Sequence, residues 1–282
     1  MRPHREILIL LIVATLLVDM SALELARQIT WMPGPTVELV LALSLSQVVL
    51  LTSWAVLGTS PFVLRMLGLA AGVAAWPWAL ESIFQLPRDN RWYVLFTTHA
   101  SLALVGALWH RLRGIRWTVR HHSGHSRQQA ASAAPWQFSL AHLFVIMSFA
   151  ALAAVQIRQS NLTSAVWVHL MLLAGSSAAI GTVTIGTASG RLGGMPLAGT
   201  FLLAVVLGCG GAVMLGLDER FYTVICGLQP LLLLSWIAVA EMAGYRLVRT
   251  VVIERQPPAV QVSTFDAAAA EHGSRAPPPE SE

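Results

Sequence analysis

Apolar residues occur along the chain in eight runs, separated by short polar or arginine-bearing segments. A helix needs about 20 predominantly apolar residues to cross a bilayer. Lipid offers no hydrogen-bond partner to backbone N–H and C=O groups, so such runs are expected to be helical. The runs cover residues 7–23, 37–57, 62–81, 92–110, 138–156, 164–186, 196–217 and 221–245. We therefore predict an all-α fold, a polytopic transmembrane helix bundle of about eight spans.

The runs divide into two groups of four. Residues 1–110 form the first four-helix half, 111–137 a basic cytoplasmic loop, 138–245 the second half, and 246–282 a basic juxtamembrane segment followed by a Pro/Ala-rich tail. The tail has too little apolar surface to fold and is predicted to be disordered. Each half ends in arginines, in WHRLRGIR and in GYRLVRTVVIER. A parallel repeat, as in some transporters, would give this pattern, but the halves do not match residue by residue, which favours chance.

Composition and charge support a membrane location. The chain is 55% hydrophobic and 11% charged, with a mean hydropathy of +0.64, whereas soluble domains have about 25% charged residues. All 18 basic residues are arginine. With a cytoplasmic N-terminus and alternating spans, thirteen arginines fall inside and five outside. This bias follows the positive-inside rule, so we predict a multi-pass membrane protein with both termini cytoplasmic.

Three binding partners are considered for the basic loop after the fourth run: lipid headgroups, nucleic acid and a metal ion. Its arginines are predicted to contact anionic lipid headgroups, and no nucleic-acid-binding fold surrounds them. Its histidines have no nearby cysteine or carboxylate to complete a structural zinc site, so no metal is predicted. The four arginines assigned to lipid contact are Arg111, Arg113, Arg116 and Arg120.

Cys209 and Cys226 are predicted to be buried free thiols.

Ionisable and polar side chains within the spans are candidates for a function, because they are costly in the bilayer. Two sets are predicted, an outward-facing pocket that forms a ligand or ion pathway and an inner polar pair of His142 with Glu241. In the pathway, Pro230 frees a backbone carbonyl beside a glutamine. The alternative is that each histidine makes one interhelical hydrogen bond and that the carboxylates reach the interface. The pathway residues are Asp19, Glu38, His99, His169, Gln229 and Pro230. Haem would need two axial histidines at matching depth; His99 and His169 would fit, but no second pair exists and no cofactor is predicted.

The entry to the fifth run is WQFSLAHLFVIMSFAAL, which begins at Trp136. Its Phe138-Ser139-Leu140 step resembles a juxtamembrane segment of uncharacterised planctomycete inner-membrane proteins. The resemblance covers about twenty residues and implies a bacterial inner-membrane protein without a defined chemistry. Ser139 is suited to cap the helix as it leaves the interface.

These features favour a small-solute or ion permease. The alternative is a non-catalytic scaffold or sensor that uses the basic loop and the tail as its cytoplasmic contacts. An enzyme is the third choice, because the sequence contains no evident nucleophile with its base and no multi-ligand metal set. The expected partners are an anionic bilayer and a small solute or ion.

Overall fold

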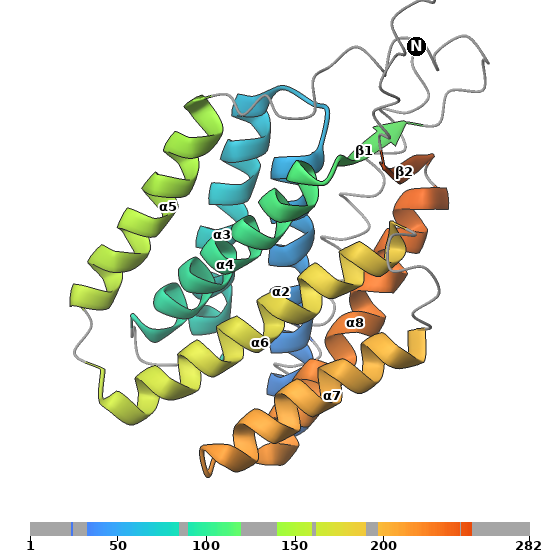
Figure 1. The fold of residues 1–282 in the computed structure, drawn as a ribbon. Helices are drawn as coiled ribbons and strands as arrows, with labels where there is room; N and C mark the ends of the chain where they lie inside the picture. The colour runs from blue at the N-terminus through green and yellow to red at the C-terminus, as the bar shows by residue number, and fades with distance from the viewer. Residues whose placement is uncertain are drawn as a thin grey trace, which may run out of the picture. The chain divides into compact units, whose positions relative to one another are not determined.

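The computed structural model describes residue 24 and residues 33–84, 90–119, 140–159, 162–189, 197–242 and 244–249. These residues belong to one unit, Met1–Thr250, and form a mostly helical bundle (Figure 1). The helices are α2 (Pro33–Leu57), α3 (Phe62–Phe84), α4 (Arg91–Leu112), α5 (Leu140–Gln159), α6 (Ser164–Ala188), α7 (Leu197–Met214) and α8 (Glu219–Met242). The strands are β1 (Ile115–Val119) and β2 (Tyr245–Arg249).

Five of the described helices are long and apolar enough to cross a membrane by length and composition. They are Thr36–Leu57, Phe62–Ser82, Arg91–Leu112, Ser164–Ala188 and Glu219–Met242. Shorter apolar stretches, Met147–Gln156 and Ala204–Met214, lie in α5 and α7. The predicted first run, 7–23, lies outside the described residues. Five spans are therefore supported by the described part of the chain, and the predicted number of eight remains a prediction.

The prediction of an all-α fold missed one element, because β1 and β2 pair in an antiparallel two-stranded sheet. The sequence analysis assigned the residues of β1 to a basic loop and those of β2 to the end of a span and its juxtamembrane segment. Each strand follows its helix directly through a glycine in the left-handed region, Gly114 at φ 81° and Gly244 at φ 87°. A glycine adopts this conformation at little cost, so each helix stops and the chain turns at once into a strand.

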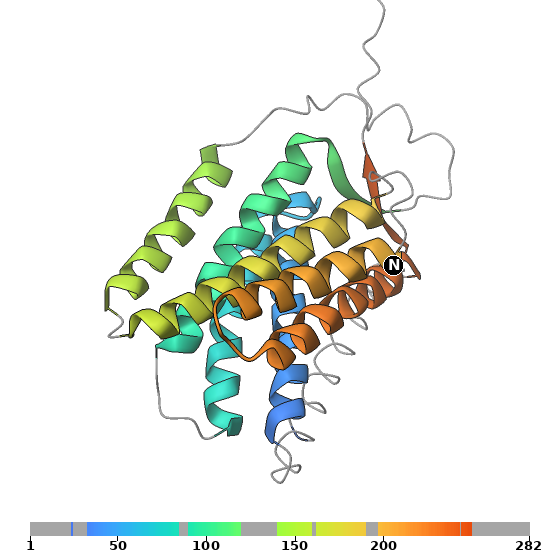
Figure 2. The same ribbon diagram turned by 60° about the horizontal axis from the view of Figure 1, so that its bottom comes forward.

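The bundle is built around α2, α4, α6 and α8. In this group α2 packs against α4 and α8, and α6 packs against the same two helices. Helix α3 lies against α2 and α4, α7 against α6 and α8, and α5 against α4. Figures 1 and 2 both show α5 at the margin of the bundle. The four central helices therefore have the most protein contact, and the other three cover them.

Residues near the starts of all four central helices meet in one cavity, whereas the sheet follows the ends of α4 and α8. The central helices therefore run in the same direction. We call the end where they begin the cavity end and the opposite end the sheet end.

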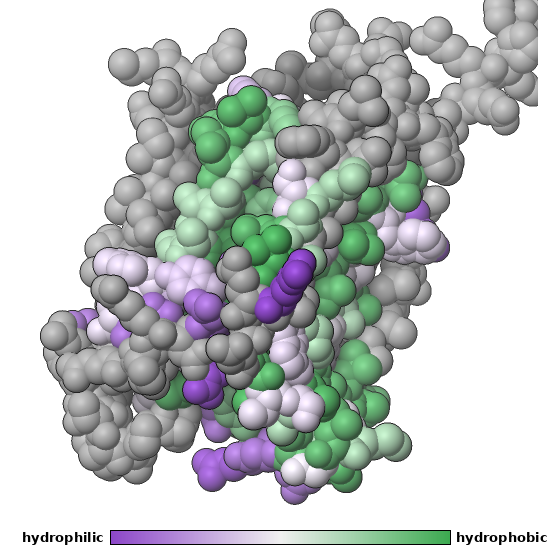
Figure 3. Space-filling view, turned by 90° about the vertical axis from the view of Figure 1, so that its left-hand side faces the viewer, coloured by the Kyte–Doolittle hydropathy of each residue, from purple (hydrophilic) through white to green (hydrophobic). Residues whose placement is uncertain are grey.

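Large apolar side chains are exposed on the covering helices. Val63, Leu64 and Leu67 of α3 are more than half exposed, as are Leu202 and Val206 of α7. Hydrophobic residues also cover much of the described surface that faces the viewer in Figure 3, and hydrophilic residues lie toward its left-hand side, at its lower edge and at one place near its centre. In water such a surface would be unfavourable, but it is suited to contact with lipid.

Two glycines lie where α6 packs closely against another central helix. A Cβ on Gly106 of α4 would lie 2.0 Å from Oγ1 of Thr182, and one on Gly181 of α6 would lie 2.6 Å from Cγ1 of Val49. Both glycines are at contacts of α6 with another central helix. Small residues let helix backbones approach where dispersion has to replace the hydrophobic effect.

Candidate functional site

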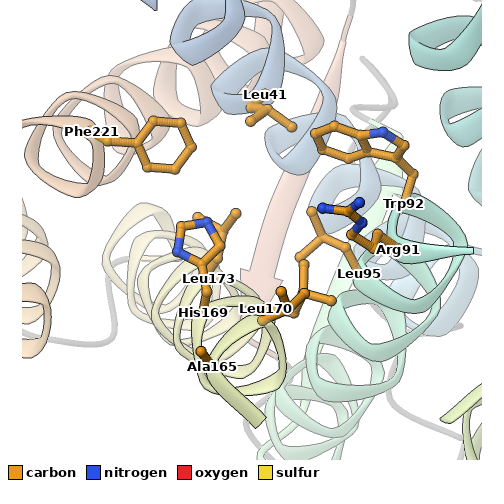
Figure 4. A pocket seen from close by; sticks show the side chains of 10 residues that line it. Leu41, Arg91, Trp92, Leu95, Ala165, His169, Leu170, Leu173 and Phe221 are labelled. Atoms are coloured by element: carbon orange, nitrogen blue, oxygen red, sulfur yellow. The ribbon is translucent and has the colours of Figure 1, made fainter. Parts of the chain in front are cut away.

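The cavity at the cavity end has a volume of about 410 Å³, which is within the usual range for small-molecule sites. All four central helices contribute to its wall (Figure 4). The lining residues are Leu41, Arg91, Trp92, Leu95, Ala165, Val166, His169, Leu170, Leu173 and Phe221. Two of these side chains, Arg91 and His169, are strongly polar, and the remaining wall is almost entirely aliphatic or aromatic.

The starts of three helices surround this cavity. Arg91 is the first residue of α4, Ala165 the second of α6 and Phe221 the third of α8. The first N–H groups of a helix have no partner within the helix, and the helix dipole places partial positive charge there. The guanidinium of Arg91 points into the space between the walls in Figure 4. The cavity therefore combines an apolar body with one guanidinium and three helix starts on its wall.

His169 is held in a cluster of rings. Its ring centroid lies 5.7 Å from that of Phe221 and 5.2 Å from that of Tyr222. The Tyr222 hydroxyl lies 2.8 Å from Nδ1 of His169 and 3.0 Å from its carbonyl oxygen. Both contacts are satisfied when Nδ1–H donates to the phenol oxygen and the phenol O–H donates to the carbonyl. This arrangement fixes the ring and leaves Nε2 out of the pairing.

Glu38 is buried near the start of α2, with 7% of its surface exposed. It does not line the cavity. Its charged neighbours are Asp218, just before α8, and Arg220, in the first turn of α8. The predicted pathway residue therefore lies among charges at the cavity end. Arg220 and Asp218 place opposite charges near it.

His99 lies one helical turn beyond the cavity-lining residues and is fully buried. Nε2 is 3.1 Å from the carbonyl oxygen of Leu45, and Nδ1 is 3.2 Å from that of Ala174. Leu41, Leu95 and Leu170 line the cavity, and each is four residues before one of these three residues. The imidazole therefore lies between a carbonyl of α2 and a carbonyl of α6 just beneath the cavity, and it does not line the cavity. Of the two histidines predicted to share one pocket, His169 lines this cavity and His99 does not.

A further set of buried polar groups surrounds Gln229 in α8. Its Nε2 donates to the carbonyl of Ser177 at 3.0 Å, and Ser46 Oγ lies 3.5 Å from its backbone carbonyl. Pro230 follows within the same helix. Gln229 Oε1 and Ser177 Oγ are buried and have no hydrogen-bond partner among the described residues. A polar layer of α2, α6 and α8 thus lies deeper in the bundle, with hydrogen-bonding capacity to spare.

The arginines at the sheet end contact protein groups. Arg65 donates through Nη1 to the carbonyls of Ala55 and Gly58, both at 2.7 Å, and Arg111 donates to the Val56 carbonyl. These are among the last carbonyls of α2, which lack partners within the helix. Arg113 stacks on Trp109, with 4.0 Å between its guanidinium carbon and the ring centroid.

These contacts change part of the lipid-headgroup prediction. Arg111 is used to cap a helix, so its hydrogen bonds go to protein and not only to headgroups. Arg116 is half-buried, and its Nε has no hydrogen-bond partner among the described atoms. Arg120 lies outside the described residues.

The remaining predicted residues are placed in part. Asp19 and the tail lie outside the described residues, as does the side chain of His142, although its backbone is in α5. Glu241 is exposed at the end of α8 and lines a shallow pocket of about 190 Å³ with Gly244, Tyr245 and Arg246. The pairing of His142 with Glu241 therefore stays a prediction.

The sequence analysis did not include Arg91, Trp92 and Tyr222 among the candidate site residues. Arg91-Trp92 was visible as a cation next to an amphipathic ring at the start of a span, which is a usual interface anchor. Tyr222 likewise lies in the first turn of its helix, α8. What the sequence did not show is that these helix starts converge on one cavity.

Cys209 and Cys226 are free thiols, and Cys226 is buried. Within the described ranges, no three His, Cys, Asp or Glu side chains come close enough to hold a metal ion. The fold and the cavity define the class of the protein, a bundle of apolar helices of membrane-spanning length with a mainly apolar cavity at one end. No family model, curated protein or solved structure matches the chain.

Proposed function

We propose that this protein is a permease of about eight spans that binds a small organic anion in the cavity between α2, α4, α6 and α8. In this proposal the sheet end faces the cytoplasm of a bacterium, both termini are cytoplasmic, and the exposed arginines of the sheet end meet anionic headgroups. The cavity is the observation that supports the proposal most directly. It opens at one end of the bundle and lies above buried polar groups at His99 and Gln229.

The chemistry of the wall indicates the class of solute. The leucines, Trp92 and Phe221 favour an apolar or aromatic body, and Arg91 and the three helix starts favour a negative group. Glu38, Asp218 and Arg220 are two carboxyl groups and one guanidinium near the same end of the bundle. None of them lines the cavity, so the preference is assigned to the lining residues. An amphipathic anion of about the size of a substituted benzene fits both features.

Benzenesulfonate is a suitable probe, because its sulfonate stays ionised at working pH and crosses lipid slowly. We expect the purified protein to bind benzenesulfonate in calorimetry and to bind benzyl alcohol and phenyltrimethylammonium much more weakly. Proteoliposomes containing the protein should take up radiolabelled benzenesulfonate faster than protein-free liposomes.

Arg91→Gln should weaken benzenesulfonate binding about tenfold or more, since a hydrogen bond to a charged group is worth about 1.5–3 kcal/mol and 1.4 kcal/mol is a factor of ten. Arg158→Gln is the matched control, because Arg158 is exposed at the end of α5 and does not line the cavity. Equal binding of the cationic probe would refute the anion assignment. Binding without uptake would refute the permease and would favour a sensor.

A further inference from the structure

Helices and strands recur along the chain at a constant interval. Gly114 and Gly244, the two glycines with φ near +80° that link a helix to a strand, stand 130 positions apart. The same shift moves β1 from 115–119 to 245–249, which is β2. It moves the ends of α2, α3 and α4 to positions 187, 214 and 242, and α6, α7 and α8 end at Ala188, Met214 and Met242. Four consecutive elements therefore recur in the same order and with nearly the same ends.

The packing follows the same relation. The shift exchanges α2 with α6 and α4 with α8, and both the α2–α4 and α6–α8 contacts exist. The cross contacts α2–α8 and α4–α6 also exchange with each other, as do α2–α3 with α6–α7 and α3–α4 with α7–α8. A simple sequence of similar hairpins would not require the cross contacts to match. A two-fold rotation does require it.

The strand register is also two-fold symmetric. Trp117 pairs with Leu247, which is its own equivalent under the shift, and the other pairs are arranged evenly around it. The pair Ile115–Arg249 is exchanged with Val119–Tyr245. Two strands that a two-fold axis relates can pair in this register only when the axis passes through the centre of the sheet, between Trp117 and Leu247.

From these relations we infer that residues 33–119 and 164–249 are two repeats, each of three helices and a strand, around a pseudo-two-fold axis. We infer further that the solute cavity lies on this axis and that the β1–β2 sheet is the gate that closes its other end. Arg91 and Phe221 occupy equivalent positions, and both line the cavity. His99 and Gln229 are equivalent as well: His99 faces a carbonyl of α2 and Gln229 bonds to a carbonyl of α6, and the rotation exchanges these two helices. Looking into the cavity, the arrow of a strand lies in the background (Figure 4).

The sheet is constructed as a closure. Ile115, Trp117 and Leu247 are buried on its inner face, and Trp117 Nε1 donates to Ser53 Oγ of α2 at 3.1 Å. Arg246 and Val248 on the other face are exposed. Separating the repeats at this end must break the strand pairing and expose the buried indole. The gate assignment rests on the permease proposed above, whereas the repeat and the axis do not.

A disulfide between the strands tests the gate. Thr118 and Arg246 are directly paired, and facing residues of antiparallel strands are within disulfide reach. In a background with Cys209→Ser and Cys226→Ala, the variant Thr118→Cys/Arg246→Cys should oxidise readily. We expect it to bind benzenesulfonate with unchanged affinity but to lose at least nine-tenths of uptake, and reduction should restore uptake. The twin Thr118→Ser/Arg246→Ser should transport under either condition.

A second measurement does not depend on transport. Ser53→Cys is placed behind Trp117, and its reaction with a charged maleimide is followed in nanodiscs, where both faces are accessible. The rate should fall at least tenfold when the strands are cross-linked. An equal rate, or a thiol that does not react even without the cross-link, would overturn the gate.

The two proposals can fail separately. If benzenesulfonate neither binds nor enters but the cross-link still protects Ser53→Cys, the solute assignment is wrong and the moving closure stands. If uptake continues in the cross-linked protein, the gate is wrong and the permease stands. Failure of the cysteine pair to oxidise would contradict the strand register on which the axis depends.

Discussion

Gly175 and Gly181 lie on the same helix, α6, in different surroundings. A Cβ at Gly175 would meet nothing within 4 Å, whereas one at Gly181 would lie 2.6 and 2.7 Å from the two γ-carbons of Val49. Replacing a helical glycine by alanine gains about 0.8–1.0 kcal/mol from helix propensity at either site. Forcing a methyl group into a packed contact costs about 1–3 kcal/mol. Gly175→Ala should therefore stabilise the bundle by up to about 1 kcal/mol, and Gly181→Ala should be about neutral or destabilising by up to about 2 kcal/mol.

The difference between the two variants is the useful quantity, because the propensity gain cancels. We expect Gly181→Ala to be about 1–3 kcal/mol less stable than Gly175→Ala in reversible SDS unfolding from mixed micelles. When both variants are made in a Val49→Ala background, most of this difference should disappear, since Val49→Ala removes the γ-carbons that the new methyl group would meet. Equal stabilities for the two alanine variants would show that α2 and α6 do not approach at Gly181, and the packing of the central helices described above would then be wrong.

Three further outcomes are expected. His99→Leu should lower the free energy of unfolding by about 0.6–1.7 kcal/mol, the range for an interhelical hydrogen bond in a membrane, and Ser101→Ala, whose hydroxyl bonds only within α4, should cost clearly less in the same SDS titration. Burial raises the pKa of the Tyr245 phenol, because the buried phenol is favoured over the buried phenolate. The contribution of the neutral phenol to the free energy of unfolding is therefore complete below the ordinary phenol pKa of about 10 and is lost as pH rises above it. Tyr245→Phe should flatten this decline of stability in an alkaline titration, and an unchanged decline would count against the burial. Gly114→Ala and Gly244→Ala should each cost about 1 kcal/mol or more because alanine is strained at positive φ, and a large inequality between them would argue against equivalent turns.

The helices were predictable and the sheet was not considered. The ends of α4 and α8 fall within a few residues of the predicted runs, because an apolar stretch in lipid has no alternative to helix. In the strands, Ile115 and Trp117 alternate with Arg116 and Thr118 directly after a glycine. This period of two is a strand signal, but in an arginine-rich segment it was interpreted as headgroup contact. Pairing with a partner 130 positions away also depends on tertiary structure, which one sequence does not give.

The histidines show where depth along a helix is informative and where it is not. Counting residues predicts related depths for His99 and His169 on the same side, and the structure has His169 in the wall of the cavity and His99 about one turn beyond it. The direction of each side chain around its helix decides the role, however. His169 faces the cavity and Tyr222, whereas His99 is directed between two helix backbones. Hydrophobicity nearly uniform around these helices gives no signal for that rotation.

The arginines of the sheet end have two roles that a charge count cannot separate. Arg65 and Arg111 donate to the last carbonyls of α2, and a cation at a helix C-terminus is favoured by the helix dipole whichever side of the membrane it is on. These two therefore support a cytoplasmic location less than an exposed arginine does. With both removed from the predicted distribution, eleven arginines remain on one side against five on the other. The orientation proposed for the bundle is consequently weakened but keeps its sign.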